Sequence, residues 1–591
     1  MDVDLLPTGS NVADLAEDTG LPDGTLRVAL VHAEIAWKDR DRNISSLLAL
    51  NEEAAGSGSK IILNTELATT GYAFESRKEI APLTETIPGP TTEAFGIVAR
   101  EYGCYICIGL AERDARTGLF YNSAVLLDPT GRVSARYRKA SPAFRENLWA
   151  AKGNLPVPVA KTRFGPLGIV ICADSYSYRQ ARIAALKGAV LLLIPANWPP
   201  QHHNPDKFWR ARALENGMYV LACNRAGRDR AIDCSLAESF IIDPQGRTIS
   251  KTSSRKDTII YGNLPLRKGL ICQGSWGSPD VLGSGGTNHD LLRGRRPGCY
   301  CNIALDPYSY INIELLLGLP QAADFNVATL QFSPRPQDPD ANMDRILQLI
   351  DDAVSQSIER ERAIDLAVLP ELSTSGPIFS LEEALVCAEE VPGRTTDILS
   401  WRAGRWRLFL VLGMAERDGE KLYNSSVIIG PEGVVGRYRK VHLSEMDRGW
   451  ASPGNEGFST HDLPFARIGM LIGHDLVFPE AADSLAKLGA DMLCVPALWH
   501  DAETKFIWEA RLAEQMHLAV ANQWGGRIQA VGGSLLCNYS RHPERISHLW
   551  SPLRGDAIRA MRFRAGDARE KRFLENVDYD LLLQPEVADP H

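Results

Sequence analysis

Residues 109–113 read Gly-Leu-Ala-Glu-Arg, and residues 413–417 read Gly-Met-Ala-Glu-Arg. Other motifs recur around them in the same order: Glu66 and Glu371, each with a glycine five residues later; Ile-Pro-Gly at 87–89 and Val-Pro-Gly at 391–393; Tyr-Asn-Ser at 121–123 and 423–425; and Tyr-Arg-Lys at 137–139 and 438–440. So many ordered matches, so far apart, predict a tandem duplication of one large domain rather than a solenoid of short repeats.

The duplication divides the chain into segments. We predict a flexible acidic tail at 1–24, a first copy at 25–270, a linker at 271–324 and a second copy at 325–591. Glycine, serine and proline are concentrated at 274–286, which favours a linker there. The basic run at 293–296 is expected to be a solvated surface or to supply a partner for a salt bridge at a rim.

Short apolar or β-branched runs alternate with longer helical patterns in the first copy. The predicted strands are 26–32, 61–64, 105–110, 124–127, 167–171 and 190–194, and the predicted helices are 43–55, 92–102, 178–187 and 208–216. Asp-Pro-x-Gly at 128–131 and 243–246 predicts two hairpin turns. This alternation is typical of a layered α/β fold with a mixed sheet.

Composition excludes several classes of protein. The 591 residues are 45% hydrophobic and 23% charged, as in ordinary globular proteins. The net charge of −9 argues against a nucleic-acid partner or a basic membrane-surface protein. No apolar run reaches the ~18 residues that span a bilayer, and residues 1–20 have no basic region of a signal peptide. Eleven scattered cysteines suggest free thiols in a reducing cytoplasm.

Three residues of the first copy follow strand-like runs and carry suitable chemistry: Glu66, Lys139 and Cys172. Residues in this position commonly form the active sites of α/β folds. A cysteine nucleophile needs a base to take its proton and a cation to hold developing negative charge. Glutamate and lysine supply both roles, and Glu146, seven residues after Lys139, adds a second carboxylate. We expect no metal and no cofactor.

These motifs resemble the nitrilase, or carbon–nitrogen hydrolase, superfamily. Its Glu–Lys–Cys triad matches Glu66 in Asn-Thr-Glu-Leu, Lys139 in Tyr-Arg-Lys and Cys172 in Gly-Ile-Val-Ile-Cys-Ala-Asp, and its additional glutamate matches Glu146. The resemblance covers nearly all of both copies and implies two tandem four-layer α-β-β-α sandwiches. It also implies hydrolysis of a small-molecule amide through an acyl thioester, with Lys139 and the backbone N–H of Ala173 stabilising the oxyanion.

The second copy departs from this pattern at the nucleophile. Cys172 lies 33 residues after Lys139, and the same count from Lys440 reaches Gly473. An aspartate two residues later in both copies supports this register. We therefore predict that the second copy is non-catalytic. His474 is expected to be a hydrogen-bonded structural histidine, and a replacement base or ligand is the alternative.

The resemblance also suggests how the copies are arranged. Members of the superfamily commonly pair through the helices that flank the nucleophile strand. Two copies in one chain can form this pair internally, because a tether raises the effective concentration to the ~mM range. We expect an internal pseudo-dimer in which the second copy supports the loops around Cys172. A further homo-oligomer remains open.

The residues after Cys172 bear on the substrate. The common amidase pattern has arginine at +4 and Pro-Glu at +6 and +7, whereas this chain has Tyr176 and then Tyr178-Arg179. The missing arginine argues against an N-carbamoyl amino acid, unless Arg179 takes its place. True nitrilases usually place Trp-Glu after the cysteine, so Ala-Asp at 173–174 favours an amide over a nitrile.

Tyr176, Trp198 and the neighbouring His202 and His203 are expected near the pocket mouth. Aromatic side chains there suit an apolar or planar acyl group. The two histidines lack a third ligand at metal-site spacing, and Cys104-x-x-Cys107 has the odd spacing that puts two strand side chains on opposite faces. We therefore interpret that cysteine pair as core packing.

Other activities are compatible with the same residues. An acyltransferase or an ammonia donor could use the same acyl thioester, and a nitrile is a further possible substrate. A non-catalytic binding or assembly protein is the alternative from another class, against which the intact set of Glu66, Lys139 and Cys172 argues.

Overall fold

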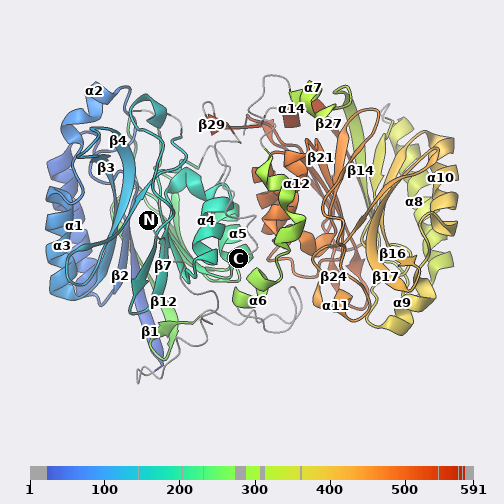
Figure 1. The fold of residues 1–591 in the computed structure, drawn as a ribbon, viewed down its shortest axis with the longest axis horizontal. Coiled ribbons are helices and arrows are strands. Elements are labelled where there is room, and N and C mark those ends of the chain that lie inside the picture. The colour runs from blue at the N-terminus through green and yellow to red at the C-terminus, as the bar shows by residue number, and fades with distance from the viewer. Residues whose placement is uncertain are drawn as a thin grey trace, which may run out of the picture.

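The computed structural model describes residues 23–143, 145–200, 204–230, 232–272, 288–305, 313–359, 363–542, 545–569, 571–574 and 577–578. Figure 1 shows the two copies side by side, each with two sheets between layers of helices. Each copy is thus the four-layer α-β-β-α sandwich that the resemblance implies. No helix among the described residues is long and apolar enough to cross a membrane.

The outer sheet of the first copy pairs its strands in the order β13 (Leu270–Ile271), β12 (Thr258–Arg267), β1 (Gly24–His32), β2 (Ile61–Asn64), β3 (Tyr105–Arg113), β4 (Phe120–Leu127) and β5 (Val133–Arg138). Its inner sheet has the order β11 (Thr248–Ser253), β10 (Glu238–Ile242), β9 (Tyr219–Cys223), β8 (Leu191–Pro195), β7 (Gly165–Ile169) and β6 (Val159–Thr162). β1–β3 and β7–β9 are parallel, and antiparallel strands complete both sheets.

Helices cover the outer face of each sheet. They are α1 (Arg40–Gly56), the short α2 (Arg77–Ile80) and α3 (Pro90–Tyr102) on one side, and α4 (Arg179–Leu186) and α5 (Asp206–Asn216) on the other (Figure 1). The 3-10 segments η2 (Ala81–Leu83), η3 (Glu146–Leu148) and η4 (Cys172–Ser175) lie in connecting loops. The local sequence sets the ends of α3. Pro90 is its first residue, and Gly103 ends the helix in a left-handed conformation.

The second copy repeats this topology. Its sheets have the orders β27 (Ala557–Arg564), β14 (Asp324–Gln331), β15 (Leu366–Val368), β16 (Phe409–Asp418), β17 (Lys421–Gly430), β18 (Gly433–Arg439), and β26 (His548–Trp550), β25 (Leu535–Cys537), β22 (His517–Asn522), β21 (Met492–Ala497), β20 (Arg467–Met470), β19 (Thr460–Asp462). Its helices are α8 (Pro339–Glu359), α9 (Leu381–Cys387), α10 (Arg394–Trp406), α11 (Glu445–Arg448), α12 (Pro479–Lys487), α13 (Phe506–Ala510) and α14 (Ala565–Arg569), with η8 (Gly473–Val477) and η9 (Arg511–Glu514). Small pairs, β23 (Trp524–Gly525) with β24 (Ala530–Val531) and β28 (Arg572–Leu574) with β29 (Val577–Asp578), complete it.

The linker predicted at 271–324 contains regular structure as well as loop. α6 (Asn288–Arg293), η5 (Pro297–Cys299), η6 (Cys301–Ala304) and α7 (Ile313–Leu317) lie within it. The Gly/Ser-rich stretch at 274–286 is outside the described residues, as is nearly all of the predicted tail. The basic run was expected at a solvated surface or a rim, but Arg295 is buried and bonds Glu480 at 2.7 Å. The expected salt bridge is therefore present, but Arg295 makes it in a buried position rather than at a solvated surface or a rim.

The two copies pack against each other through their inner helices. Figure 1 shows α4 and α12 facing each other between the copies. α5 contacts α13, and Arg179 of α4 bonds Asp483 of α12. Apolar residues of both copies belong to one continuous buried cluster that includes the inner sheets. Cys107 belongs to this cluster and Cys104 to the one under α1 and α3, so the two cysteines do point to opposite faces. All eleven cysteines are free.

Candidate active site

Cys172 stands at a sharp turn between a strand and a short helix. β7 ends at Ile169, and Cys172 opens η4 with a φ of 44°. The left-handed conformation costs a residue with a Cβ about 1–2 kcal/mol, so the surrounding structure must hold it there. Gly473 has the same place in the second copy with a φ of 29°. Both copies therefore keep the turn, and only the first carries a thiol on it.

Glu66 follows β2 and is fixed by two neighbours. A Cβ on Gly109 of β3 would lie only 2.7 Å from Cα of Glu66, and Gly413 stands in the same relation to Glu371 at 2.5 Å. The glycine that opens the Gly-x-Ala-Glu-Arg motif is thus required by close backbone approach. Asn197, after β8, donates its backbone N–H to Oε2 of Glu66 and its side-chain amide to the Glu66 carbonyl, each at 2.8 Å.

Lys139 follows β5, whose end is anchored by Arg138. The Arg138 guanidinium donates through Nε to both carboxylate oxygens of Glu112 at 3.1 Å, and through Nη2 to Asp114 at 2.6 Å. A Cβ on Gly153 would lie 2.1 Å from the Arg138 carbonyl oxygen. The repeated Glu, Arg and Gly residues therefore fix the end of β5, and with it the position of Lys139.

Two donors and two carboxylates form a closed cluster. Nζ of Lys139 donates to Oε1 of Glu66 at 2.7 Å and to Oε1 of Glu146 at 2.8 Å. Nδ2 of Asn122 donates to the same two oxygens, at 2.7 Å and 2.8 Å. All four side chains are buried. Each of the two oxygens thus has two donors, and the ammonium is held between the carboxylates.

The charges of this cluster reach the thiol. Burial and the charge of Glu66 raise the pKa of Cys172 well above its ordinary value, while Lys139 and the backbone N–H of Asn197 act in the opposite direction. The resting thiol is therefore protonated and needs a base before it can act as a nucleophile. Burial lowers the pKa of Lys139, but Glu146 and Glu66 outweigh it and raise that pKa well above the usual value. Burial raises the pKa of Glu146 to about 7.

Asp174 ties the turn at Cys172 to the loop that follows Lys139. Tyr137 donates its hydroxyl to Oδ2 of Asp174 at 2.9 Å, and the backbone N–H of Ser141 donates to Oδ1 at 2.8 Å. Asp475 accepts the matching bond from Tyr438 in the second copy at 2.8 Å. Because these bonds join the loops that carry Cys172 and Lys139, they fix the spacing between the two.

The structure brings together Glu66, Lys139, Glu146 and the turn at Cys172. It adds Asn122 and Asn197, to which the sequence interpretation assigns no role. Asn122 lies in the repeated Tyr-Asn-Ser motif, which was the available signal. Asn197 has no such signal, because the aligned residue of the second copy is Leu498, so the asparagine is not part of a repeated motif.

Tyr176 and Trp198 belong to a cluster of aromatic rings. The centroid of Tyr176 lies 4.5 Å from that of Phe208, and Trp198 stacks on Phe208 at 6.5 Å and meets Trp209 edge-on at 5.9 Å. These side chains are buried, beside the turn that begins at Cys172. His202 and His203 lie outside the described residues. No group of three or more His, Cys, Asp or Glu in the described part of the chain is arranged to hold a metal ion.

Arg179 was the candidate to replace the missing family arginine. Its guanidinium instead donates to both carboxylate oxygens of Asp483, at 2.6 Å and 2.7 Å, and is buried. It is therefore directed to the second copy and is not a clamp for a substrate carboxylate.

The second copy keeps the cluster around a nucleophile position that carries no side chain. Nζ of Lys440 donates to Glu371 and Asp447, each at 2.7 Å, and Asn424 bonds the same two carboxylates at 2.7 Å and 2.8 Å. A Cβ on Gly473 would lie 2.5 Å from Oε2 of Glu371. The carboxylate therefore occupies the space into which a side chain at this position would project.

His474 is buried beside this cluster. Burial, Lys440 and His442 lower its pKa to about 3, so the ring is neutral. Its Nδ1 has no hydrogen-bond partner among the described residues, which does not fit the hydrogen-bonded structural histidine that we expected. Its ring meets Phe478 edge-on at 5.6 Å, so packing rather than hydrogen bonding holds it.

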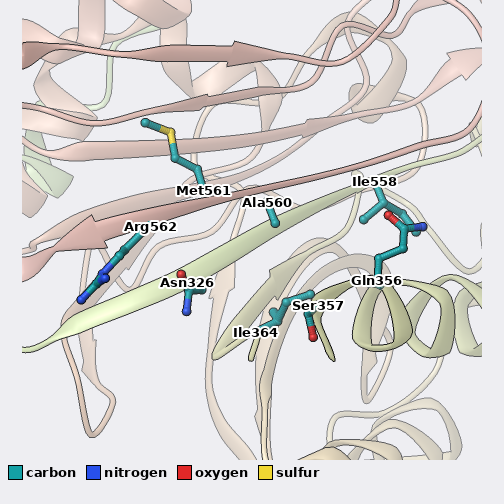
Figure 2. A pocket seen from close by; sticks show the side chains of 9 residues that line it. Asn326, Gln356, Ser357, Ile364, Ile558, Ala560, Met561 and Arg562 are labelled. Carbon is teal, nitrogen blue, oxygen red and sulfur yellow. The ribbon is translucent and has the colours of Figure 1, made fainter. Parts of the chain in front are cut away.

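A hollow lies elsewhere on the second copy. Figure 2 shows Gln356 and Ser357 of α8 and Asn326 of β14 around it, together with Met561 and Arg562 of β27. Its lining includes neither the residues of the Glu66 cluster nor their counterparts in the second copy. The hollow is therefore separate from the nucleophile turns of both copies.

Comparison with known proteins identifies the family. The model of the carbon-nitrogen hydrolase family matches residues 27–268 and again 326–540. A nitrilase from Pyrococcus abyssi is 40% identical over 242 residues, covering 41% of this chain and 90% of the relative, and omega-amidase NIT2 from Homo sapiens is 28% identical over 258 residues, covering 41% and 90%. A solved carbon-nitrogen hydrolase from Helicobacter pylori G27 aligns with a TM-score of 0.37 and 24% identity, over 41% of this chain and 89% of that one. The chain therefore belongs to the carbon-nitrogen hydrolase family, and it contains the family's domain twice.

Proposed function

We propose that the first copy is a cysteine amidase that hydrolyses small non-peptide amides. Glu66 takes the proton of the Cys172 thiol, and the thiolate attacks the amide carbonyl carbon. The oxyanion is stabilised by Lys139 and by the backbone N–H of Ala173. The tetrahedral adduct then collapses, Glu66 gives its proton to the departing amine, and an acyl thioester on Cys172 remains.

Water completes the cycle in the second half-reaction. Glu66 takes a proton from the water molecule as it attacks the thioester carbonyl, and the new oxyanion meets the same two donors. Collapse releases the carboxylic acid, and the Cys172 sulfur recovers its proton from Glu66. Each positioned donor of this kind contributes roughly 3 kcal/mol to lowering the barrier.

The observation that carries the proposal is the buried contact of Glu66 with Lys139 next to a thiol held at positive φ. A thiol with a raised pKa needs an adjacent base, and Glu66 is that base. An oxyanion needs a cation that stays charged in a buried site, and two carboxylates keep Lys139 charged. Glu146 also accepts the N–H of Ala143 at 2.9 Å, so we assign it the positioning of Lys139.

The aromatic cluster of Tyr176, Trp198 and Phe208 favours an apolar or planar acyl group. Arg179 is engaged by Asp483, which disfavours a substrate that needs a guanidinium clamp at that place. Among the relatives, the name omega-amidase favours amides, and the name nitrilase makes nitriles the second substrate class to test. We assign no catalytic role to the second copy, because Gly473 offers no nucleophile.

The test is ammonia release from a panel of aliphatic and aromatic amides, with the matching nitriles alongside. Cys172→Ala is expected to lower kcat/KM for any accepted amide by at least ~10³-fold, because all covalent catalysis is lost. Cys301→Ala changes an exposed thiol and is the matched control, with activity retained. Acid quench and peptide mass spectrometry should find the acyl group on Cys172.

Two outcomes would contradict the proposal: unchanged turnover in Cys172→Ala, or an acyl adduct on another cysteine. Hydroxamate formed in the presence of hydroxylamine would extend the activity to acyl transfer. A panel with no turnover and no adduct would favour a non-catalytic binding protein.

A further inference from the structure

The contact between the copies has an unusual distribution of charge. The register that aligns Cys172 with Gly473 also aligns Arg179 with Glu480 and Arg182 with Asp483. These residues lie on α4 and α12, the helices that follow the nucleophile turns and that face each other across the contact (Figure 1). At both aligned positions the first copy is basic and the second is acidic.

The four residues pair across the contact in a two-fold pattern. Arg179 bonds Asp483 at 2.6 Å, and Nε of Arg182 lies 3.0 Å from Oε1 of Glu480. Positions are counted here from Cys172 in the first copy and from Gly473 in the second. Each pair joins position +7 of one copy to position +10 of the other, so exchange of the two copies converts the first pair into the second. All four side chains are at most 1% exposed, so neither pair is screened by water.

α5 and α13 show the same separation of charge. Trp209 aligns with Trp508, which aligns Arg210 with Glu509 and Lys207 with Phe506. Lys207 forms an ion pair with Glu509. On the opposite side of the two-fold, the Arg210 guanidinium lies over the Phe506 ring, 4.2 Å from its centroid. Here too the first copy supplies the cations, and the second supplies a carboxylate or a ring face.

One pair on this face does not differ between the copies. Arg511 bonds Glu215 at 2.6 Å, and the aligned residues are again an arginine and a glutamate, Arg212 and Glu514. Such a pair can form between any two copies, like or unlike. The discriminating charges are therefore those at which the copies have diverged.

We propose that this face is a charge-coded surface that accepts only an unlike copy as its partner. If two first copies paired in this way, Arg179 would face Arg182, and Lys207 would face Arg210. If two second copies paired, Glu480 would face Asp483. Like charges at the buried positions of α4 and α12 are strongly unfavourable, so the same residues that hold the unlike pair reject both like pairs.

A residue of the linker adds a further cation to the acidic side of this contact. Nε of Arg295 donates to Oε1 of Glu480 at 2.7 Å, so Glu480 has a cation from the first copy and another from the segment that joins the copies. The acidic face of the second copy is thereby neutralised within its own chain. The arrangement gives the duplicated chain an internal pair and removes this face as a site of association between chains through like copies.

Charge reversal in the full chain tests the proposal without reference to activity. Asp483→Arg places a cation against Arg179 and should lower the midpoint of thermal unfolding by roughly 10 °C, with an increased radius of gyration in small-angle scattering as the copies separate. Adding Arg179→Asp restores an opposite pair and should recover at least half of both changes. Asp340→Arg reverses an exposed ion pair with Arg394 on the second copy and is the control, with a shift under roughly 2 °C.

If the reversal variants do not fold, neutral variants give the same comparison. Asp483→Asn leaves Arg179 buried without its anionic partner, and Arg179→Gln in the same chain removes that charge. The double neutral variant should then be more stable than Asp483→Asn alone. The proposal is overturned if the double variant of either series is no more stable than its Asp483 single variant. It is also overturned if Asp483→Arg leaves the midpoint unchanged.

Discussion

At position 473 the second copy has the same backbone turn as Cys172 in the first copy, with a glycine in place of the cysteine. Its φ of 29° lies near the 44° of Cys172, and the glutamate, lysine and asparagine around it keep their hydrogen bonds. Glycine adopts a positive φ without the cost that Cys172 bears. The turn at Gly473 is therefore less strained than the turn at Cys172, and Lys440 and Asn424 still donate hydrogen bonds to the two carboxylates beside it.

This geometry predicts that the second site cannot be restored by one substitution. In a Cys172→Ala background, Gly473→Cys should give no ammonia release, because its Cβ would lie 2.5 Å from Oε2 of Glu371. Either the carboxylate moves out of its hydrogen bonds or the turn distorts, and both should lower the stability by about 1–3 kcal/mol. The measurements are ammonia release and the denaturation midpoint. Recovered turnover would show that the Glu371 side chain moves away from the new cysteine at little cost.

Glu371 also predicts a pH dependence of stability. Burial raises its pKa to about 7, above its value in an unfolded chain. The folded state thus holds the proton more tightly, and the stability gained is complete below about pH 4.5 and is lost as the pH rises through 7. Glu371→Gln has no such proton. Between pH 5 and pH 8 the free energy of unfolding of this variant, relative to the parent, should rise by roughly 1–3 kcal/mol.

Urea denaturation at pH 5 and pH 8 measures this change. Glu420→Gln, on an exposed turn, is the control, and its free energy of unfolding relative to the parent should be the same at both pH values. An equal difference for Glu371→Gln at pH 5 and pH 8 would contradict the assigned cause.

At the scale of elements, the duplication supplies matched controls for the site. Asn122 on β4 and Asn424 on β17 make the same two hydrogen bonds to the two carboxylates of their copies. Asn122→Leu should lower kcat by about 10²-fold, because Glu66 and Glu146 lose a shared donor and move relative to the thiol. Asn424→Leu should leave kcat within twofold of the parent. Steady-state kinetics on an accepted amide, with circular dichroism to verify folding, decides between them; equal losses in both variants would indicate a general effect on stability.

Strands and helices with strong apolar patterns were predictable from the sequence. β2 has the predicted bounds, and the other predicted strands and helices of the first copy were found with ends shifted by a few residues. Polar or short strands were missed, such as β11, whose side chains are largely exposed at a sheet edge. Such strands are set by pairing with a neighbour, which the local sequence does not reveal.

The site shows the same division. The sequence indicated Glu66, Lys139 and Cys172 as candidates because they follow strand-like runs in spaced motifs, and Glu146 through its offset from Lys139. Asn197 was not, because it acts through its backbone N–H and reaches Glu66 from a strand far along the chain. The direction of Arg179 was equally hidden, since its partner Asp483 belongs to the other copy.

At the scale of the whole molecule, the second copy contacts the segment that follows the turn at Cys172. η4 begins at Cys172 and leads within seven residues to Arg179, which opens α4. Tyr178 donates its hydroxyl to Oδ2 of Asp483 at 2.7 Å, next to the Arg179 contacts. One carboxylate of the second copy therefore holds the far end of the segment whose near end is the nucleophile. The two-fold counterpart of Asp483 is Arg182, which forms an ion pair with Glu480 at the start of α12, after the turn that has no thiol.

This arrangement predicts that neutralising the acidic partners of the two ion pairs has different effects on catalysis. Asp483→Asn and Glu480→Gln each weaken a buried cross-copy ion pair, so both should lower the unfolding midpoint. Asp483 contacts Tyr178 and Arg179, whereas Glu480 contacts Arg182, three residues further along α4 from Cys172. Asp483→Asn should therefore lower kcat by about 3–10-fold with KM little changed. Glu480→Gln should keep kcat within twofold, measured below the unfolding transition of each variant. Equal kcat for the two variants would mean that the second copy stabilises the fold without positioning the Cys172 thiol. Contacts at the start of α4 would then affect Cys172 no more than contacts at the start of α12.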